Sequence, residues 1–257
     1  MFDVRYRLAS SQGWLPKMAQ IALLLVIVRL TDSTAQALTL PGLPPVMTSG
    51  HADLAVSFSP LTSKILVRAG AVVDGVAVGT DTYYNPDELL FLTGATRLAP
   101  LDNSLSFTGA LAGDSVWVFP ETATSGVPFV GISNQSLSAA DWVGDLTWRV
   151  TAIDKPSNSE FSIWIDGVSG PQVIVSTLDG LPDQFQLPAG GHQHFNFGLS
   201  KAGYYGVTFE VSGTHVNTGF QSASGYYMFG TVPEPGTLCL ASLAVSLVII
   251  SRRGWRR

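Results

Sequence analysis

The sequence predicts an all-β fold, an antiparallel β-sandwich of the immunoglobulin-like or jelly-roll-like kind, flanked by an N-terminal signal helix and a C-terminal transmembrane helix. Short runs rich in Val, Ile, Trp, Tyr and Phe are separated by Gly, Asp, Asn, Pro and Ser. Polar and apolar residues alternate with period two at 146–150 and 161–165, and the runs recur about every 8–12 residues, as in a sandwich. The two ends of the chain carry apolar segments of another kind.

The N-terminal end has the composition of a secretory signal peptide. A stretch with three basic residues precedes an apolar run at 19–28, and the triplet Ala-Gln-Ala follows at 35–37. This order predicts a signal peptide at 1–37. A buried core helix is the alternative, and the polar residues and small-residue triplet directly behind the run disfavour it. Because the basic stretch is long for a signal, translation from Met18 is an alternative to Met1.

The C-terminal end has the composition of a membrane anchor. Residues 236–251 are apolar and uncharged, and arginines follow directly. A helix needs about 20 apolar residues to cross a bilayer, with about 17 as the short limit, so this segment lies at or just under the limit. Arginines stay on the cytoplasmic side by the positive-inside rule, which places the rest of the mature chain outside the cell.

A tripeptide before this anchor, together with the arginines after it, resembles the PEP-CTERM sorting signal. The resemblance covers 232–257, and six residues carry it: Val232, Pro233, Glu234, Pro235, Arg252 and Arg253. It implies recognition by an exosortase-type membrane enzyme, removal of the tail, and delivery of an inner-membrane-anchored precursor to the cell envelope, cell surface or extracellular matrix. The two prolines keep the recognition segment extended and outside the helix.

The body between these ends is acidic and contains no cysteine. Residues 38–231 hold six basic side chains against sixteen acidic ones, a net charge of −10, whereas the whole chain has −5. A basic footprint for nucleic acid is therefore absent from the sequence. The single cysteine, Cys239, lies in the predicted anchor, so the body has to fold on its hydrophobic core without disulfides.

Two short stretches offer a candidate metal site. His192 and His194 are two residues apart, and so are His51 and Asp53, so that each pair lies on one face if its stretch is a strand. Three imidazoles and a carboxylate are a plausible tetrahedral donor set for zinc. Spacing alone does not show that the stretches meet, and histidines that only form hydrogen bonds are the alternative. His215 is a spare candidate.

The sequence assigns no catalytic residue. A cupin-like metal enzyme would place a glutamate three or four residues after the H-x-H pair, where this chain has Gly198 and Leu199. Neither a G-x-S-x-G nucleophile motif nor a phosphate-binding G-x-x-x-x-G-K-[ST] loop is present. Tryptophans in or beside the predicted strands are expected to pack in the core, with a carbohydrate platform as the alternative. They are Trp117, Trp142, Trp148 and Trp164.

The body resembles a known family. The stretches SGHADLAV, GDSVWVFPET, DLTWRVTAI and LPAGGHQHFNFGLSKAGYYGVTFEV, in this order, resemble the choice-of-anchor M domain and the related actinobacterial surface-anchored repeat. The resemblance spans most of 48–212. It implies an exported protein without catalytic activity, fixed to the cell by its C-terminal signal, and some relatives are associated with metal-uptake systems. Asn196 follows the family pattern, whereas Phe197 stands where the pattern has tryptophan.

These observations divide the chain into four parts: a signal peptide (1–37), a choice-of-anchor M-like domain (38–216), a linker or last strand (217–231) and the sorting signal with its transmembrane helix (232–257). We expect an exported, non-catalytic surface or matrix protein that binds a transition metal such as zinc. A purely structural or adhesive protein is the first alternative and a cupin-like enzyme the second. Expected partners are the exosortase-type enzyme, the membrane and extracellular polysaccharide or matrix, with no nucleic acid.

Overall fold

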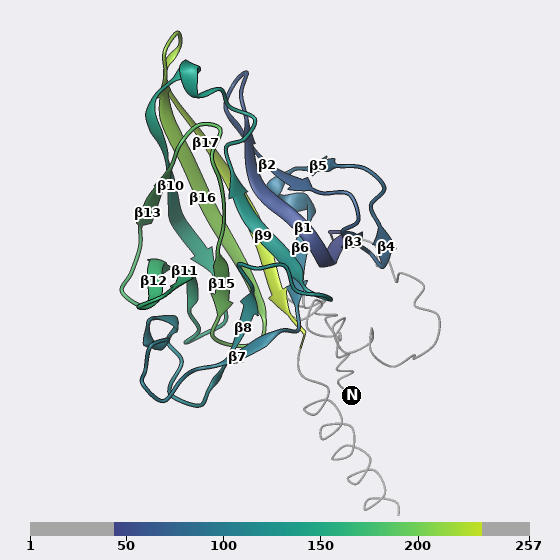
Figure 1. The fold of residues 1–257 in the computed structure, drawn as a ribbon, viewed down its shortest axis with the longest axis vertical. Coiled ribbons are helices and arrows are strands. Elements are labelled where there is room, and N and C mark those ends of the chain that lie inside the picture. Colours follow the sequence, from purple (N-terminus) through teal and green to yellow (C-terminus); the bar gives the residue numbers. More distant parts are fainter. Residues whose placement is uncertain (1–43, 233–257) are drawn as a thin grey trace, which may run out of the picture.

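A computed structural model describes residues 44–232, and the predicted signal peptide, sorting signal and transmembrane helix lie outside these residues apart from Val232. The fold of this part is all-β, as predicted (Figure 1). Its helical elements are three short 3₁₀ turns: η1 (Pro86–Glu88), η2 (Ser106–Thr108) and η3 (Ala139–Asp141). None of the helices between 44 and 232 has the length and apolar character needed to cross a bilayer.

A sheet of twelve strands forms the larger part of the fold. Its main path runs through β13 (Asp183–Leu187), β10 (Trp142–Asp154), β16 (Tyr204–His215), β17 (Gly219–Thr231), β6 (Leu90–Thr93), β1 (Val46–Ser57), β2 (Thr62–Val67) and β5 (Thr82–Tyr84). Beside this path, β9 (Pro128–Ser133) pairs with β1, and β14 (His192–His194) pairs with β9. The short strands β3 (Val72–Val73) and β4 (Val76–Ala77) form a hairpin next to the start of β1.

The second sheet has five antiparallel strands. Their order is β12 (Gly170–Ser176), β11 (Phe161–Gly167), β15 (Asn196–Leu199), β8 (Ser115–Phe119) and β7 (Thr96–Leu98). The chain passes from the larger sheet into this one at Phe195, between β14 and β15. The metal-site candidates on β14 therefore lie where the two sheets are joined.

The expectation of wholly antiparallel pairing is wrong for the larger sheet. Strand β1 runs parallel to β6 through Val46 and Met47 and parallel to β9 from Gly50 onward, and β17 also runs parallel to β6. The period-two pattern reports which face of a strand is buried, and that pattern is the same whichever way the neighbouring strand runs. Strand direction was therefore not readable from the sequence.

The two sheets contact each other through aromatic side chains. Phe229 of β17 has its ring centroid 5.5 Å from that of Phe119, 5.8 Å from that of Phe161 and 5.6 Å from that of Phe197, which belong to three strands of the smaller sheet. All four phenylalanines are fully buried. Among the tryptophans, Trp142, Trp148 and Trp164 are buried and Trp117 packs partly buried against the core. They are core residues and do not form an exposed platform.

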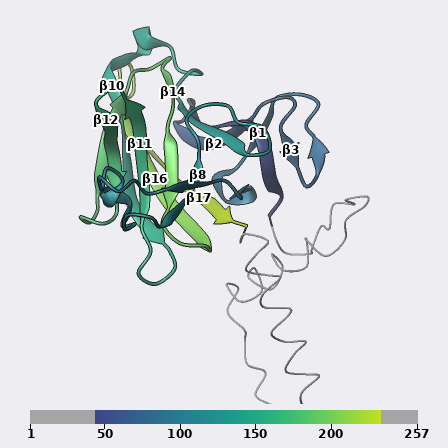
Figure 2. The same cartoon turned by 60° about the horizontal axis from the view of Figure 1, so that its bottom comes forward.

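Both ends of the described chain lie at the same end of the molecule. Leu90 of β6 pairs with Val46, near the start of β1, and with Met228, near the end of β17. Val232 donates its N–H to the carbonyl of Thr93 at 2.8 Å. The first and last described residues, 44 and 232, are therefore close together (Figures 1 and 2).

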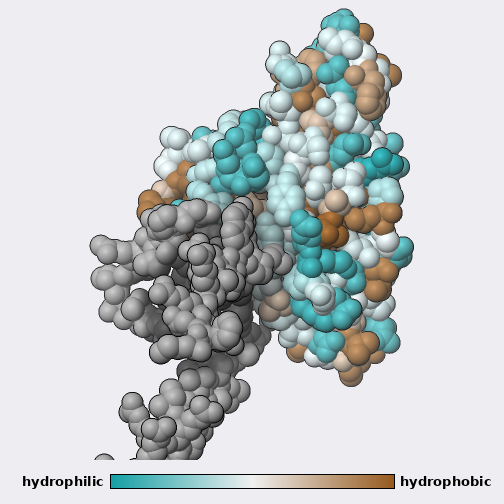
Figure 3. Space-filling view, turned by 180° about the vertical axis from the view of Figure 1, so that it is seen from behind, coloured by the Kyte–Doolittle hydropathy of each residue, from teal (hydrophilic) through white to brown (hydrophobic). Residues whose placement is uncertain are grey.

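Residues 217–231, for which the sequence left a linker or a strand open, mostly form β17. This strand pairs with β16 along its whole length, from Tyr204↔Gly230 to His215↔Gly219. On the face of the described residues seen in Figure 3, apolar side chains lie singly among polar ones and do not gather in a large patch.

Candidate metal centre

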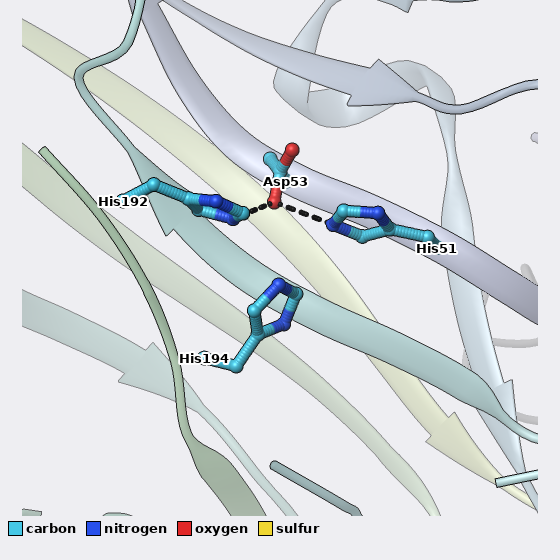
Figure 4. Close-up of side chains that lie close together, drawn as sticks. All are labelled: His51, Asp53, His192 and His194. Carbon is cyan, nitrogen blue, oxygen red and sulfur yellow. Dashed lines mark hydrogen bonds and ion pairs between the residues drawn. The ribbon is translucent and has the colours of Figure 1, made fainter. Parts of the chain in front are cut away.

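The four residues predicted as metal ligands come together on three neighbouring strands. His51 and Asp53 lie on β1, His192 and His194 lie on β14, and β9 runs between these two strands. In register, Asp53 is opposite Gly131 of β9, and Gly131 is opposite His194. The side chains share one face because each pair is two residues apart in its strand. Figure 4 shows all four turned toward the same space.

One donor atom from each side chain lies within 4.8 Å of every other. The Oδ1 atom of Asp53 lies 3.0 Å from Nε2 of His51 and 2.7 Å from Nε2 of His192. With Zn–ligand bonds of about 2.0–2.1 Å, the ligand atoms of a tetrahedral site are separated by about 3.3 Å. Two separations are therefore already short enough, and the widest pair has to approach by at most about 1.5 Å to hold one ion.

These side chains can pack this closely over β9 because residue 131 is glycine. A Cβ atom on Gly131 would lie 2.5 Å from Oδ1 of Asp53, 2.8 Å from Nε2 of His192 and 2.9 Å from Cε1 of His194. A Cβ atom essentially never makes contacts shorter than 3.0 Å, so any other residue would displace the cluster. The isolated glycine in the apolar stretch PFVGIS was the one sequence signal for it, because glycine within a strand marks the close approach of another group.

Asp53 is an ionised carboxylate although it is fully buried. Burial disfavours its charged form, but hydrogen bonds and charge interactions with His51 and His192 outweigh burial and hold the pKa of Asp53 below its ordinary value. Its other oxygen, Oδ2, accepts from Nε of Arg68 at 3.3 Å and lies 3.2 Å from Nη2. Sequence reasoning did not find Arg68, since nothing in its local pattern points to Asp53.

His194 keeps a lone pair available near neutral pH. Burial and the nearby His51 and His192 lower its pKa from 6.5 to about 4. Its Nδ1 atom is buried and has no hydrogen-bond partner among residues 44–232. The ring stacks on Phe129 of β9, with the centroids 3.7 Å apart and the planes 4° from parallel. An unprotonated imidazole held in a fixed orientation is suited to bind a metal ion.

The site is open to solvent on one side. The side chains of His51 and His192 are 30% and 20% exposed, whereas that of Asp53 is not exposed at all. An ion could therefore reach the cluster past the two outer imidazoles without opening of the core.

The spare candidate, His215, lies elsewhere and has a local role. Its Nδ1 accepts the backbone N–H groups of Asn217 and Thr218 at 3.2 and 3.3 Å, in the turn between β16 and β17. Its ring stacks on Phe58 at a centroid distance of 4.3 Å. It belongs to the hairpin and does not join the cluster.

No family model, no curated protein and no solved structure matches the chain. The resemblances to the PEP-CTERM signal and to the choice-of-anchor M domain thus rest on the residues quoted for them. The chemistry of the site rests on its own geometry.

Proposed function

We propose that this chain is an exported, non-catalytic protein of the cell surface or extracellular matrix, and that its body binds one transition metal ion. The ligands are His51, Asp53, His192 and His194. The observation that carries the proposal is the convergence of their donor atoms, which pack closely over Gly131. Zinc fits best, because three imidazoles and one carboxylate are typical zinc donors.

Binding of such an ion would displace protons from its ligands. His51 and His192 each place Nε2 at hydrogen-bond distance from the same carboxylate oxygen of Asp53. Ligand nitrogens have to be deprotonated, so an ion held here takes the place of the protons in these hydrogen bonds. Asp53 provides the negative charge that offsets part of the charge of the ion.

The purely structural alternative rests on the same two hydrogen bonds. It accounts for His51, Asp53 and His192, but it leaves the approach of His194 to the same group unexplained. A metal ion accounts for the grouping of all four residues. The metal-binding proposal therefore explains more of the site than hydrogen bonding alone.

Metal analysis of the full-length chain, purified in detergent without a histidine tag, tests the proposal. We expect one equivalent of zinc per chain after dialysis against buffer with trace zinc, and a large loss in His192→Gln. The matched control is His215→Gln, which removes an imidazole outside the cluster and should retain the metal. Zero equivalents in the unmodified protein would leave the structural function as the better account.

The cupin-like alternative is disfavoured by where the chain goes after His194. Gly198 and Leu199, which stand where that family has a glutamate, lie on β15 in the smaller sheet. A carboxylate at either position would not lie on β14 beside the imidazoles. This placement supports a binding function without catalysis.

Export and anchoring are the second half of the proposal. The signal-like N-terminus, the PEP-CTERM-like tail and the exit of both ends from one end of the fold support a domain that stands on the outer side of the membrane before exosortase-type processing. Cell fractionation of the native host tests this: we expect an exported chain that has lost its tail. Glu234→Gln should retain the tail, whereas Glu210→Gln should not. An intact, untrimmed chain in the cytosol would overturn this half.

We further propose that the two sheets form a β-sandwich with one mixed sheet. The contacts of Phe229 with three strands of the smaller sheet support this architecture.

A further inference from the structure

Arg68 holds the carboxylate of Asp53 from the side that faces away from the imidazoles. Its Nε and Nη2 atoms lie 3.3 and 3.2 Å from Oδ2 of Asp53. Its Nη1 donates to Asp81 at 3.0 Å and its Nη2 donates to Gln135 at 3.0 Å. Asp81 is fixed in turn, since its Oδ1 accepts the N–H of Ala69 at 2.9 Å. The guanidinium group is therefore held from three sides.

The two oxygens of Asp53 consequently have different surroundings. Oδ1 faces His51 and His192, and Oδ2 faces Arg68. A carboxylate whose second oxygen is bound to a guanidinium group can offer an ion only one oxygen in the plane of its lone pairs. Large or oxygen-seeking cations such as calcium and manganese favour oxygen-rich sites, often with a carboxylate that binds through both oxygens.

We propose that Arg68 is the positioning residue that makes Asp53 a one-oxygen ligand, so that the site selects four-coordinate zinc over oxygen-seeking divalent cations. The inference rests on the proposed metal-binding function and adds the class of ion and the residue that sets it. Arg68 touches the ligand carboxylate and acts on the ion through it.

A positive charge near a metal site also repels every cation. Asp81 lies against the same guanidinium group and offsets part of that charge. What repulsion remains acts on all divalent ions alike, because it depends on charge and distance. The hydrogen bonds from Arg68 to Oδ2 of Asp53 have a different effect, since they change how many carboxylate oxygens an ion can bind. A change in the ratio of zinc to manganese affinity therefore distinguishes this effect from charge repulsion.

The test compares the full-length chain with Arg68→Gln, using zinc, manganese and cobalt(II) as probes. We expect the unmodified protein to prefer zinc and to give the intense visible bands of four-coordinate cobalt. Arg68→Gln should lower the zinc-to-manganese affinity ratio at least tenfold and weaken the cobalt bands as the coordination number rises. Removing a group that hydrogen-bonds a metal ligand alters metal affinity by about 10–100-fold.

Arg97→Gln is the matched control. Arg97 also pairs with a carboxylate, Asp166 at 2.7 Å, but in the smaller sheet, and this variant should keep the ratio and the spectrum of the unmodified protein. If Arg68→Gln does not fold, Asp81→Asn loosens the same guanidinium group at a half-exposed position and should shift both readouts in the same direction.

The outcomes are distinguishable. If the unmodified chain binds neither zinc nor cobalt, the proposed function fails. If it binds both, but Arg68→Gln changes zinc and manganese affinity by one common factor with the cobalt spectrum unchanged, Arg68 acts by charge alone and the inference is overturned. An equal shift of the ratio in Arg97→Gln would overturn it as well.

Discussion

Asp53 and Gly131 are register partners on the parallel strands β1 and β9, and the missing side chain of Gly131 is what leaves room beside the carboxylate of Asp53. A Cβ atom at 131 would lie 2.5 Å from Oδ1. In a sheet, the neighbour of a buried carboxylate normally fills the space next to it. Here the carboxylate and two imidazoles from a third strand pack over Gly131 instead, which brings their donor atoms together.

We expect Gly131→Ala to abolish zinc binding without removing any donor atom. The methyl group would clash with Asp53 and His192 and push them apart, and overpacking of this kind costs about 1–3 kcal/mol in the free energy of unfolding. Zinc titration followed by competition with a chromophoric chelator measures the loss. Gly79→Ala is the control, because a Cβ there has no atom within 4 Å. Unchanged zinc affinity in Gly131→Ala would place the ion elsewhere.

We expect Asp53→Asn to lose the metal and to destabilise the metal-free fold by about 2 kcal/mol. Breaking a buried ion pair costs about 3–5 kcal/mol, and the smaller value follows because Arg68 is 28% exposed and keeps its contact with Asp81. Urea unfolding in the presence of a chelator measures the stability. Asp141→Asn, at an exposed position, should stay within about 0.5 kcal/mol of the unmodified protein. Equal stabilities of the two variants would contradict this view of Asp53.

Phe229→Ala should destabilise the fold by about 3–5 kcal/mol, the cost of removing a buried phenylalanine. Phe229 contacts Phe119, Phe161 and Phe197 across the two sheets, and its loss opens a cavity between them. Phe220, in the same strand but 70% exposed, provides the comparison, and Phe220→Ala should have little effect. The midpoint of urea unfolding measures both. Similar midpoints would show that the two sheets do not share the core described for them.

The strand content and the identity of the four candidate ligands could be predicted from the sequence. Both predictions use the fact that side chains alternate between the two faces of a strand, so that every second residue shares a face. Alternation fixes which residues share a face, so His51 pairs with Asp53 and His192 with His194 wherever their strands lie. It does not fix the partner of a strand. That β9 lies between β1 and β14, and runs parallel to β1, depends on contacts between residues far apart in the chain.

Arg68 and Phe129 could not be found from the sequence for the same reason. Arg68 is 15 residues from Asp53 in the chain and follows a different strand. Phe129 stacks on His194, which lies on the neighbouring strand β14 but far away in the sequence. Only their tertiary positions give them a role. Gly131, in contrast, could have been found from the sequence, since an isolated glycine in an apolar strand indicates that another group comes close to the backbone there.

The metal-free fold should lose stability as the pH falls from about 6.5 toward 4, in part because of His194. Its pKa is about 4 in the folded chain against an ordinary 6.5, so within this window the unfolded chain binds a proton that the folded chain does not. Above pH 6.5 both states are unprotonated at this residue, and the contribution is constant. Because the pKa of Asp53 is lowered from 3.8, its own contribution is lost below this window.

Urea unfolding of chelator-treated protein at about pH 7.5 and about pH 5 measures the effect as a difference between two free energies of unfolding. In His194→Gln the residue cannot titrate, so we expect a smaller difference between the two pH values than in the unmodified protein. His215→Gln, which removes a histidine from the β16–β17 hairpin, controls for the loss of an imidazole as such. If His194→Gln and the unmodified protein lost the same stability on acidification, the pKa of His194 would be the same in the folded and the unfolded chain. That result would contradict the lowered pKa of a buried imidazole at this position.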